Sequence, residues 1–178
     1  VKNLKIEDLF VATAKSTKVN TSGSITGMPD AINANYNLKF NIKSSKEDLK
    51  SLLPDSIIPA TIEVPKLVQV NGQFKGKMNS FDAKAFIKTS FGNADATVKM
   101  NKENYTASAN IQAFNLGSLL KDTALFGVVS LQAKAEGSGL KKETIHGKVL
   151  VNIDSAELMK YNYHALNIDG TIVNEGFE

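Results

Sequence analysis

Apolar and polar residues alternate one by one through most of this chain, and this pattern limits what it can fold into. Such alternation is the sign of a β-strand with one dry face and one hydrated face. The segments that share it are 37–43, 68–76, 81–88, 94–100, 105–113, 129–136, 149–153 and 168–172. Strands buried on both faces would instead be continuously apolar, so the pattern argues against a parallel α/β sheet.

Turn-forming residues separate the alternating segments. We expect turns at Asn71-Gly72, Phe91-Gly92-Asn93, 101–104, Gly137-Ser138-Gly139 and Asn174-Glu175-Gly176. Many strands joined by short turns make an antiparallel meander. About ten strands would use up the chain, close to the limit for an open sheet before it curls or splits. The sequence predicts an all-β, mainly antiparallel fold, either a curled meander forming an open trough or a barrel-like sandwich.

Two short segments break the alternation and resemble each other. Residues 48–53, DLKSLL, recur 67 positions later as NLGSLL at 115–120. Ser44 and Ser45 precede the first copy and Pro54 follows it, and these residues are typical of helix ends. We therefore expect a short helix at 46–53, a single helical turn at 115–120 with Asn115 as its cap, and irregular linkers at 55–61 and 121–127.

The same offset continues downstream of the two helical segments. It places Asp55 on Asp122, Ile62 on Val129, Val64 on Leu131 and Gly72 on Gly139. A repeat of this kind is usually one unit of a stacked array. We interpret residues 1–178 as one β-rich segment of a longer chain, with two units at about 36–102 and 103–178.

The composition excludes several kinds of site. The chain has no cysteine, which excludes disulfides and thiolate metal sites, and its 21 basic residues are all lysine. Arginine is the side chain favoured for recognition of phosphate and guanine, so its absence argues against a nucleic-acid partner. We interpret the lysines as keeping one face of the sheet hydrated.

No set of residues in the sequence has a catalytic or metal-binding spacing. His146 and His164 are the only histidines, each at a polar position of a strand without a second ligand nearby. Ser51 and Ser118 lie in the repeated motif without a GxSxG pattern, and 137–139 lacks the GK[ST] of a phosphate loop. We therefore expect no enzymatic activity, no metal and no cofactor.

The apolar face of a meander must be covered. The sheet can close into a barrel, pack on a second sheet, accept helices, or curl into a trough that holds an apolar ligand. The expected helices are too short to cover ten strands. A membrane-spanning barrel is disfavoured because the chain has no Trp and only four Tyr to form aromatic girdles. A closed sandwich or barrel and an open trough both remain as alternatives.

Several degenerate motifs follow one another over residues 36–178. They are Gly72-x-Phe74-x-Gly76, Phe81, SFGNA at 90–94, FNLGSLLK at 114–121, AKAEGSGL at 133–140, YNY at 161–163 and LNIDGTIVN at 166–174. In this order they resemble the repeat region of bacterial AsmA/TamB-like envelope proteins, particularly the Lys- and Asn-rich versions of the Bacteroidetes type.

The resemblance implies a large protein, anchored in the inner membrane by an N-terminal helix, whose periplasmic part is a long β-sheet curled into a trough with an apolar interior. It also implies a role in phospholipid transfer between membranes and in outer-membrane protein assembly. TamB-like members work with an Omp85-type outer-membrane barrel. We therefore expect a periplasmic location and phospholipid or acyl chains as ligands. Neither the anchor nor the partner-binding end is identifiable in this sequence.

Nine apolar residues of the alternating segments are the expected lining of the trough. They are Phe40, Ile42, Phe74, Ile87, Val98, Ile111, Leu131, Val149 and Val151. In the alternative interpretation, the same residues form the closed core of a structural module whose strand edges pair with client proteins of the envelope.

Overall fold

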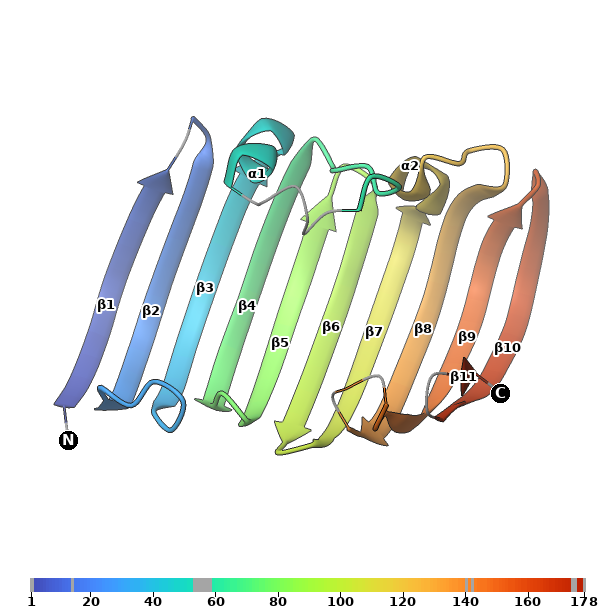
Figure 1. The fold of residues 1–178 in the computed structure, drawn as a ribbon. Helices are drawn as coiled ribbons and strands as arrows, with labels where there is room; N and C mark the ends of the chain where they lie inside the picture. Colours follow the sequence, from blue (N-terminus) through green and yellow to red (C-terminus); the bar gives the residue numbers. More distant parts are fainter. Residues whose placement is uncertain are drawn as a thin grey trace.

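The chain folds into one antiparallel sheet of 11 strands, in which every strand pairs with its neighbours in sequence (Figure 1). The computed structural model describes residues 2–13, 15–52, 59–139, 141, 143–173 and 176–177. The strands are β1 (Lys2–Thr13), β2 (Thr17–Met28), β3 (Asn35–Ser45), β4 (Leu67–Lys77), β5 (Ser80–Thr89), β6 (Gly92–Asn101), β7 (Asn104–Asn115), β8 (Phe126–Ser138), β9 (His146–Leu158), β10 (Tyr161–Val173) and β11 (Gly176–Phe177). The predicted all-β meander is confirmed, and the sheet is open, neither a barrel nor a sandwich.

The strands pair in direct register, so residues of the apolar face form straight rows across the sheet. We number three of these rows. Row 1 is Val19–Ile42–Val70–Ile87–Ala94–Ile111–Leu131–Ile153–Leu166. Row 2 is Thr21–Phe40–Gly72–Ala85–Ala96–Ala109–Ala133–Val151–Ile168. Row 3 is Gly23–Leu38–Phe74–Ala83–Val98–Ala107–Ala135–Val149–Gly170.

The sheet is a single layer with very little enclosed core. Its accessible surface is 11757 Å2, whereas a compact protein of 19.2 kDa exposes about 8,400 Å2. In the described part of the chain, the buried hydrophobic residues are Ala34, Val64, Val129 and Ala156. The apolar face is therefore half-buried by contacts between neighbouring strands, and no second layer covers its centre.

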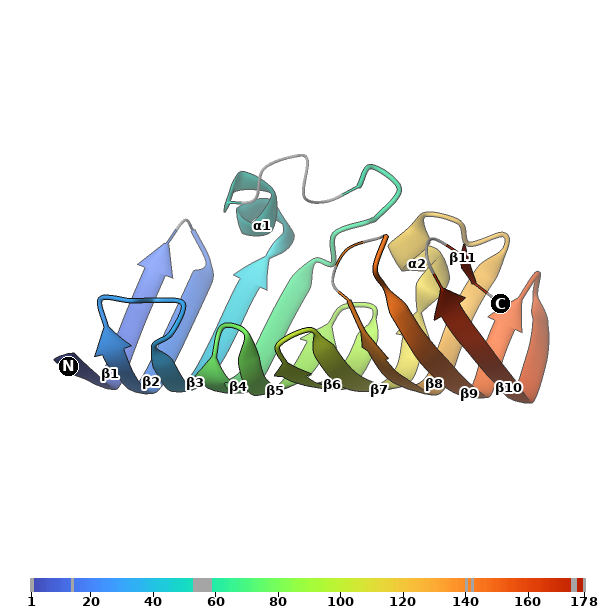
Figure 2. The same ribbon diagram turned by 60° about the horizontal axis from the view of Figure 1, so that its bottom comes forward.

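Two short helices lie at one end of the strands, α1 (Lys46–Leu52) after β3 and α2 (Leu116–Leu120) after β7. Figure 2 shows both helices, and the segment 59–66, standing above one side of the sheet. That side is the apolar face, because Ser44, in phase with Ile42, is buried beneath α1. The opposite ends of β8, β9 and β10 rise on the same side, so this face is concave (Figure 2).

Both predicted helices are confirmed, with capping by Ser45 and Asn115. The backbone N–H of Asp48 donates to Ser45 Oγ at 3.3 Å, and the N–H of Ser118 donates to Asn115 Oδ1 at 2.8 Å. The predicted end of the first helix at Pro54, and most of the linker 55–61, lie outside the described residues. Of the second linker, 121–127, the last two residues belong to β8.

Three sequence predictions were wrong. Gly72 and Gly139 are not equivalent, because Gly72 lies in the middle of β4 whereas Gly139 follows the end of β8. The chain between helix and strand is longer after α1 than after α2, so the offset of 67 does not survive beyond the helices. Asn71-Gly72 is not a turn but part of β4. The strands β1 and β2 were missed. In β2, Thr21 and Gly23 occupy positions of the apolar face where larger apolar residues would mark the alternation, and in β1 a register shift between Ile6 and Leu9 interrupts the pattern.

Candidate functional site

The concave apolar face is the candidate site, and all nine residues expected to line a trough lie on it. Row 1 contains Ile42, Ile87, Ile111 and Leu131, row 2 contains Phe40 and Val151, and row 3 contains Phe74, Val98 and Val149. Each of the nine side chains is half-buried. They come from seven different strands, β3 to β9, and the direct register alone brings them to one surface.

A fourth row completes this face towards the ends of the strands remote from the helices. It contains Ile25–Tyr36–Gly76–Phe81–Met100–Tyr105–Gly137–Gly147–Ile172. The rings of Phe74 and Phe81 lie 4.8 Å apart, and Tyr36 meets Phe74 edge-on at 6.1 Å. Sequence reasoning included Phe74 in the site but left out Tyr36 and Phe81, although they lie on the same face as the nine.

The aromatic rings of this face lie against glycines on neighbouring strands. Phe40 is the direct partner of Gly72, and a Cβ on Gly72 would come within 2.6 Å of Phe40 Cε2. Tyr105 is the partner of Gly137, where a Cβ would come within 2.7 Å of the Tyr105 hydroxyl. The two rings therefore occupy the space that a side chain at Gly72 or Gly137 would fill, and each ring lies flat over the neighbouring strand.

A segment between α1 and β4 forms a rim along the helical end of the apolar face; we call residues 59–66 the strap. The strap extends to α2, where the N–H of Glu63 donates to the Leu119 carbonyl at 2.7 Å and Lys121 Nζ donates to the Ala60 carbonyl at 2.7 Å. Figure 1 shows it crossing the ends of β4 to β7. Nothing in the alternation pattern predicted a contact between the two helical inserts.

Ion pairs reinforce the strap. The Glu63 carboxylate pairs with Lys46 at the start of α1 and lies 3.8 Å from Lys121 Nζ beyond α2. The hydrogen bond from Lys46 lowers the pKa of Glu63, an effect that partial burial opposes and the charges of nearby lysines assist. One carboxylate thus joins both helical inserts to the strap.

A buried carboxylate attaches α1 to the turn between β1 and β2. Asp48 is 3% exposed and accepts hydrogen bonds from Ser16 N (2.7 Å), Ser16 Oγ (2.8 Å), Thr17 Oγ1 (2.9 Å) and Lys15 N (3.2 Å). Burial alone would raise the pKa of Asp48, but these hydrogen bonds outweigh it and lower the pKa to about 2. The carboxylate is therefore a structural acceptor and not a proton donor at neutral pH.

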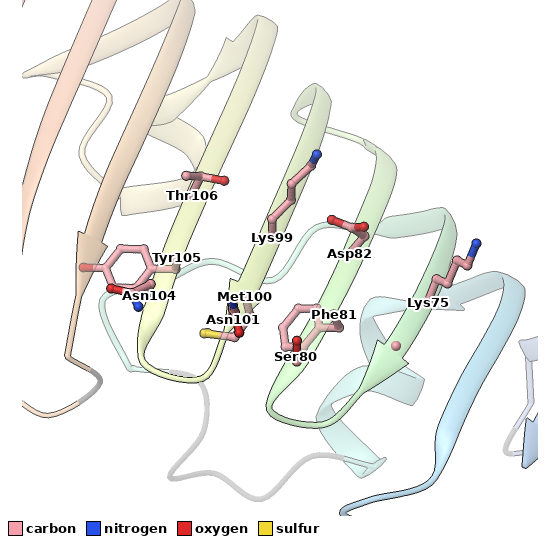
Figure 3. A pocket seen from close by; sticks show the side chains of 11 residues that line it. Lys75, Ser80, Phe81, Asp82, Lys99, Met100, Asn101, Asn104, Tyr105 and Thr106 are labelled. Atoms are coloured by element: carbon pink, nitrogen blue, oxygen red, sulfur yellow. The ribbon is translucent and has the colours of Figure 1, made fainter.

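The side chains of the opposite face are mostly polar, with Phe86 and Leu150 as exposed apolar exceptions. A hollow of about 680 Å3 lies on this face over β6 to β10, among Lys99, Lys134, Glu136, Lys148 and Asp169. Another hollow, of about 570 Å3, lies at the ends of β4 to β7 remote from the helices, where Phe81, Met100 and Tyr105 of the fourth row line it together with polar side chains such as Asp82 and Lys99 (Figure 3). None of the nine predicted residues lines either hollow.

The described residues contain no cluster of side chains that could hold a metal ion. His146 and His164 are exposed on separate strands, and no group of three His, Cys, Asp or Glu side chains converges in the described part of the chain. Among the described helices, none is long and apolar enough to cross a membrane. What the site offers chemically is an extended apolar surface.

No protein-family model, no curated protein and no solved structure matches this chain.

Proposed function

We propose that the concave apolar face binds acyl chains, and that the chain is a non-enzymatic part of a periplasmic lipid-transfer trough of the AsmA/TamB-like type. The observation that carries the proposal is the set of apolar rows in direct register across β3 to β10, on a face that no second layer of the described chain covers. Exposing such an apolar surface to water is unfavourable. Each methylene group that is removed from water contributes about 0.8 kcal/mol to the free energy of binding.

The shape of the face favours a flexible ligand over a second sheet. Two sheets that pack face to face keep about 10 Å between them over their whole area. The helices and the strap stand over one end of the face, and the ends of β8 to β10 rise at the other end (Figure 2). The face is therefore not flat enough for a second sheet to lie against its whole area. An acyl chain is narrow and can follow a concave floor. Small residues in the middle of row 2, Gly72 to Ala133, leave room above that floor.

The test is a pair of substitutions that add the same charge on opposite faces. Ile111 is half-buried on the apolar face, and its neighbour Asn110 lies on the polar face. We expect Ile111→Asp to weaken binding of a fluorescent fatty acid at least about tenfold, because the carboxylate would lose solvation next to the chain. Asn110→Asp should bind like the unmodified protein.

The outcomes separate an open trough from a closed core. If Ile111→Asp unfolds the chain while Asn110→Asp does not, the face is needed as a core and the trough proposal fails. Leu131→Asp repeats the test on the strand next to Ile111, where Leu131 is its direct partner. Native mass spectrometry of the purified protein gives an independent readout, since bound lipid adds discrete masses and an empty face does not.

A second function, pairing with client strands, is favoured by the free edge of β10. β11 covers only Ile172 and Val173 of this edge, and the described chain places no strand beside residues 161–171. An unpaired edge is a template for another strand. Protection of amides in 161–171 from hydrogen exchange when a client β-strand peptide is added, with no effect of Ile111→Asp, would support this function instead.

A further inference from the structure

Lysines are concentrated on the polar face of the first half of the sheet. Seven exposed lysines from β2 to β6 share this face: Lys18, Lys39, Lys43, Lys75, Lys84, Lys88 and Lys99. The acidic residues of β2 to β6 are Asp82 and Asp95. The strands β7 to β10 differ, because Lys134 and Lys148 are outnumbered there by Glu136, Asp154, Glu157 and Asp169. We call the surface formed by the seven lysines the basic patch.

The arrangement within the basic patch is not the one that would best stabilise the sheet. Lys18 and Lys43 are direct partners on β2 and β3, and like charges directly opposite are destabilising. Lys39 and Lys84 flank Gln73 from either side, with no acidic residue between them. In the described chain, none of the seven lysines forms an ion pair within 4.0 Å. Lys75 and Lys99, by contrast, are both direct partners of Asp82. The positive charge of the other five lysines is therefore the part that is available to a partner.

A large aromatic side chain interrupts the polar phase inside this patch. Phe86 lies on the polar face and is 40% exposed, with Asn71 and Asp95 as its partners on the flanking strands. Lys84 and Lys88 lie on either side of it along β5. An exposed aromatic ring between two lysines of the same strand is a combination that surface-bound proteins bury in the interface of a lipid bilayer.

We propose that the basic patch, with Phe86 near its centre, docks the sheet on the surface of an anionic membrane. Each lysine near such a surface gains attraction from the negative lipid headgroups, while its methylenes and the Phe86 ring contact the interfacial layer. The proposal does not depend on the trough, because the patch occupies the opposite face. It orients the apolar face away from the membrane to which the chain is docked.

Two features favour a membrane over a nucleic acid as the partner. Sequence-reading and phosphate-clamping contacts favour arginine, and the chain has none. Protein surfaces that bind single-stranded nucleic acid without base readout use several aromatic stacking platforms, whereas Phe86 is the one exposed aromatic residue on the described strands β2 to β6. Lysine charges without fixed geometry match a fluid layer of headgroups.

The experiment is co-sedimentation of the protein with vesicles of phosphatidylcholine alone and of phosphatidylcholine with phosphatidylglycerol. The patch variant carries Lys39→Glu, Lys43→Glu and Lys84→Glu. Its matched control carries Lys102→Glu, Lys141→Glu and Lys160→Glu, three exposed lysines in turns that undergo the same change of charge. A third variant, Phe86→Ser, tests the aromatic contact.

We expect binding to the anionic vesicles only, and weaker binding as salt screens the charges. The patch variant should bind about a hundredfold more weakly or worse, from about fivefold for each lysine lost, and the control variant should lose much less. Phe86→Ser should also weaken binding. The patch variant should melt no lower than the unmodified protein, because the change relieves repulsion between Lys18 and Lys43.

Equal losses in the patch and control variants would overturn the proposal, because net charge alone would then explain binding. Binding to a single-stranded DNA or to an acidic protein in preference to anionic vesicles would overturn it in favour of those partners. Retention of fatty-acid binding by the patch variant would show that this surface and the proposed trough act separately. Loss of fatty-acid binding in that variant would contradict the independence of the two surfaces, while the comparison of vesicle binding decides the docking.

Discussion

The ring of Phe40 lies on the backbone of Gly72, its direct partner on the neighbouring strand. A strand glycine next to an aromatic residue is an arrangement that fixes strand register and fills the space left by the missing side chain. Here it also keeps a large ring from standing up in the middle of row 2. The pair therefore contributes both to the stability of the sheet and to the depth of the proposed trough.

Gly72→Ala should destabilise the protein by about 1–3 kcal/mol, as is usual for an added group in a filled site. A Cβ at this position would lie 2.6 Å from Phe40 Cε2 and 2.9 Å from the Lys84 carbonyl oxygen. Urea unfolding measures the change. The double variant Gly72→Ala, Phe40→Leu should regain part of the loss, and full additivity of the two changes would show that ring and glycine do not interact.

Asp48→Asn should lower the melting temperature at neutral pH, because the amide cannot accept all four hydrogen bonds that the carboxylate receives from residues 15–17. The pKa of Asp48 is lowered in the folded protein from 3.8 to about 2, so its contribution is complete above pH 4 and is lost as the pH falls towards 2. The difference in melting temperature between the two proteins should shrink over that range.

Asp95→Asn is the control for this pH series, because Asp95 is exposed on the polar face and accepts no hydrogen bond in the described chain. Melting curves of this variant over the same pH range show the effect of removing a carboxylate that does not contact the β1–β2 turn. A constant difference for Asp48→Asn over the same range would contradict the assigned role of the carboxylate.

Asn115→Ala should destabilise the protein by about 1 kcal/mol, the usual effect of losing a helix N-cap. The side chain of Asn115 accepts from the N–H of Ser118, and its loss leaves that donor unpaired at the start of α2. Asn37→Ala is the control, since Asn37 is exposed in the middle of β3. Chemical denaturation of the two variants should differ, and equal midpoints would argue against the cap.

Glu63→Gln should loosen the strap without unfolding the sheet. The substitution removes the pairing with Lys46 and Lys121 but keeps the backbone bond from Glu63 N to the Leu119 carbonyl. Hydrogen exchange followed by mass spectrometry should show faster exchange in residues 62–66 and unchanged exchange in β4 to β8. The same local effect should appear in the unmodified protein as the pH falls below 4.5, because the pKa of Glu63 is lowered when it is paired. Uniformly faster exchange would show that the pairs support the whole fold.

Alternation was sufficient to predict the sheet because most apolar residues of a strand from β3 onwards share one parity, as do Leu38, Phe40 and Ile42, with Phe86 and Leu150 as exceptions. The strands pair in direct register even where the connection is long, as between β3 and β4, and this register brought the nine predicted residues to one face. The pattern failed where Thr and Gly hold apolar positions in β2, and at Ala113. There a positive φ of 47° and a shift in register form a bulge that ends the alternation of β7.

The sequence pattern did not predict the contacts between segments that are far apart in the chain. Asp48 and Asn115 occupy matching positions of the repeated motif, yet Asp48 crosses to the β1–β2 turn whereas Asn115 caps its own helix. The strap contacts α2 through backbone groups of Glu63 and Ala60, which any residue could supply. The spacing of residues within a motif does not predict the partner of Asp48 or the contact between the strap and α2, because both depend on how far the connecting chain extends.

The direct register of row 3, from Gly23 to Gly170, has a geometric consequence for the whole sheet. A barrel closes only when successive strands are staggered, and rows that run straight across nine strands have almost no shear. Such a sheet lengthens by adding strands without changing its cross-section. The length of the strands fixes the width of the sheet, and the number of strands fixes its length. The width of the proposed trough and its length can therefore vary independently.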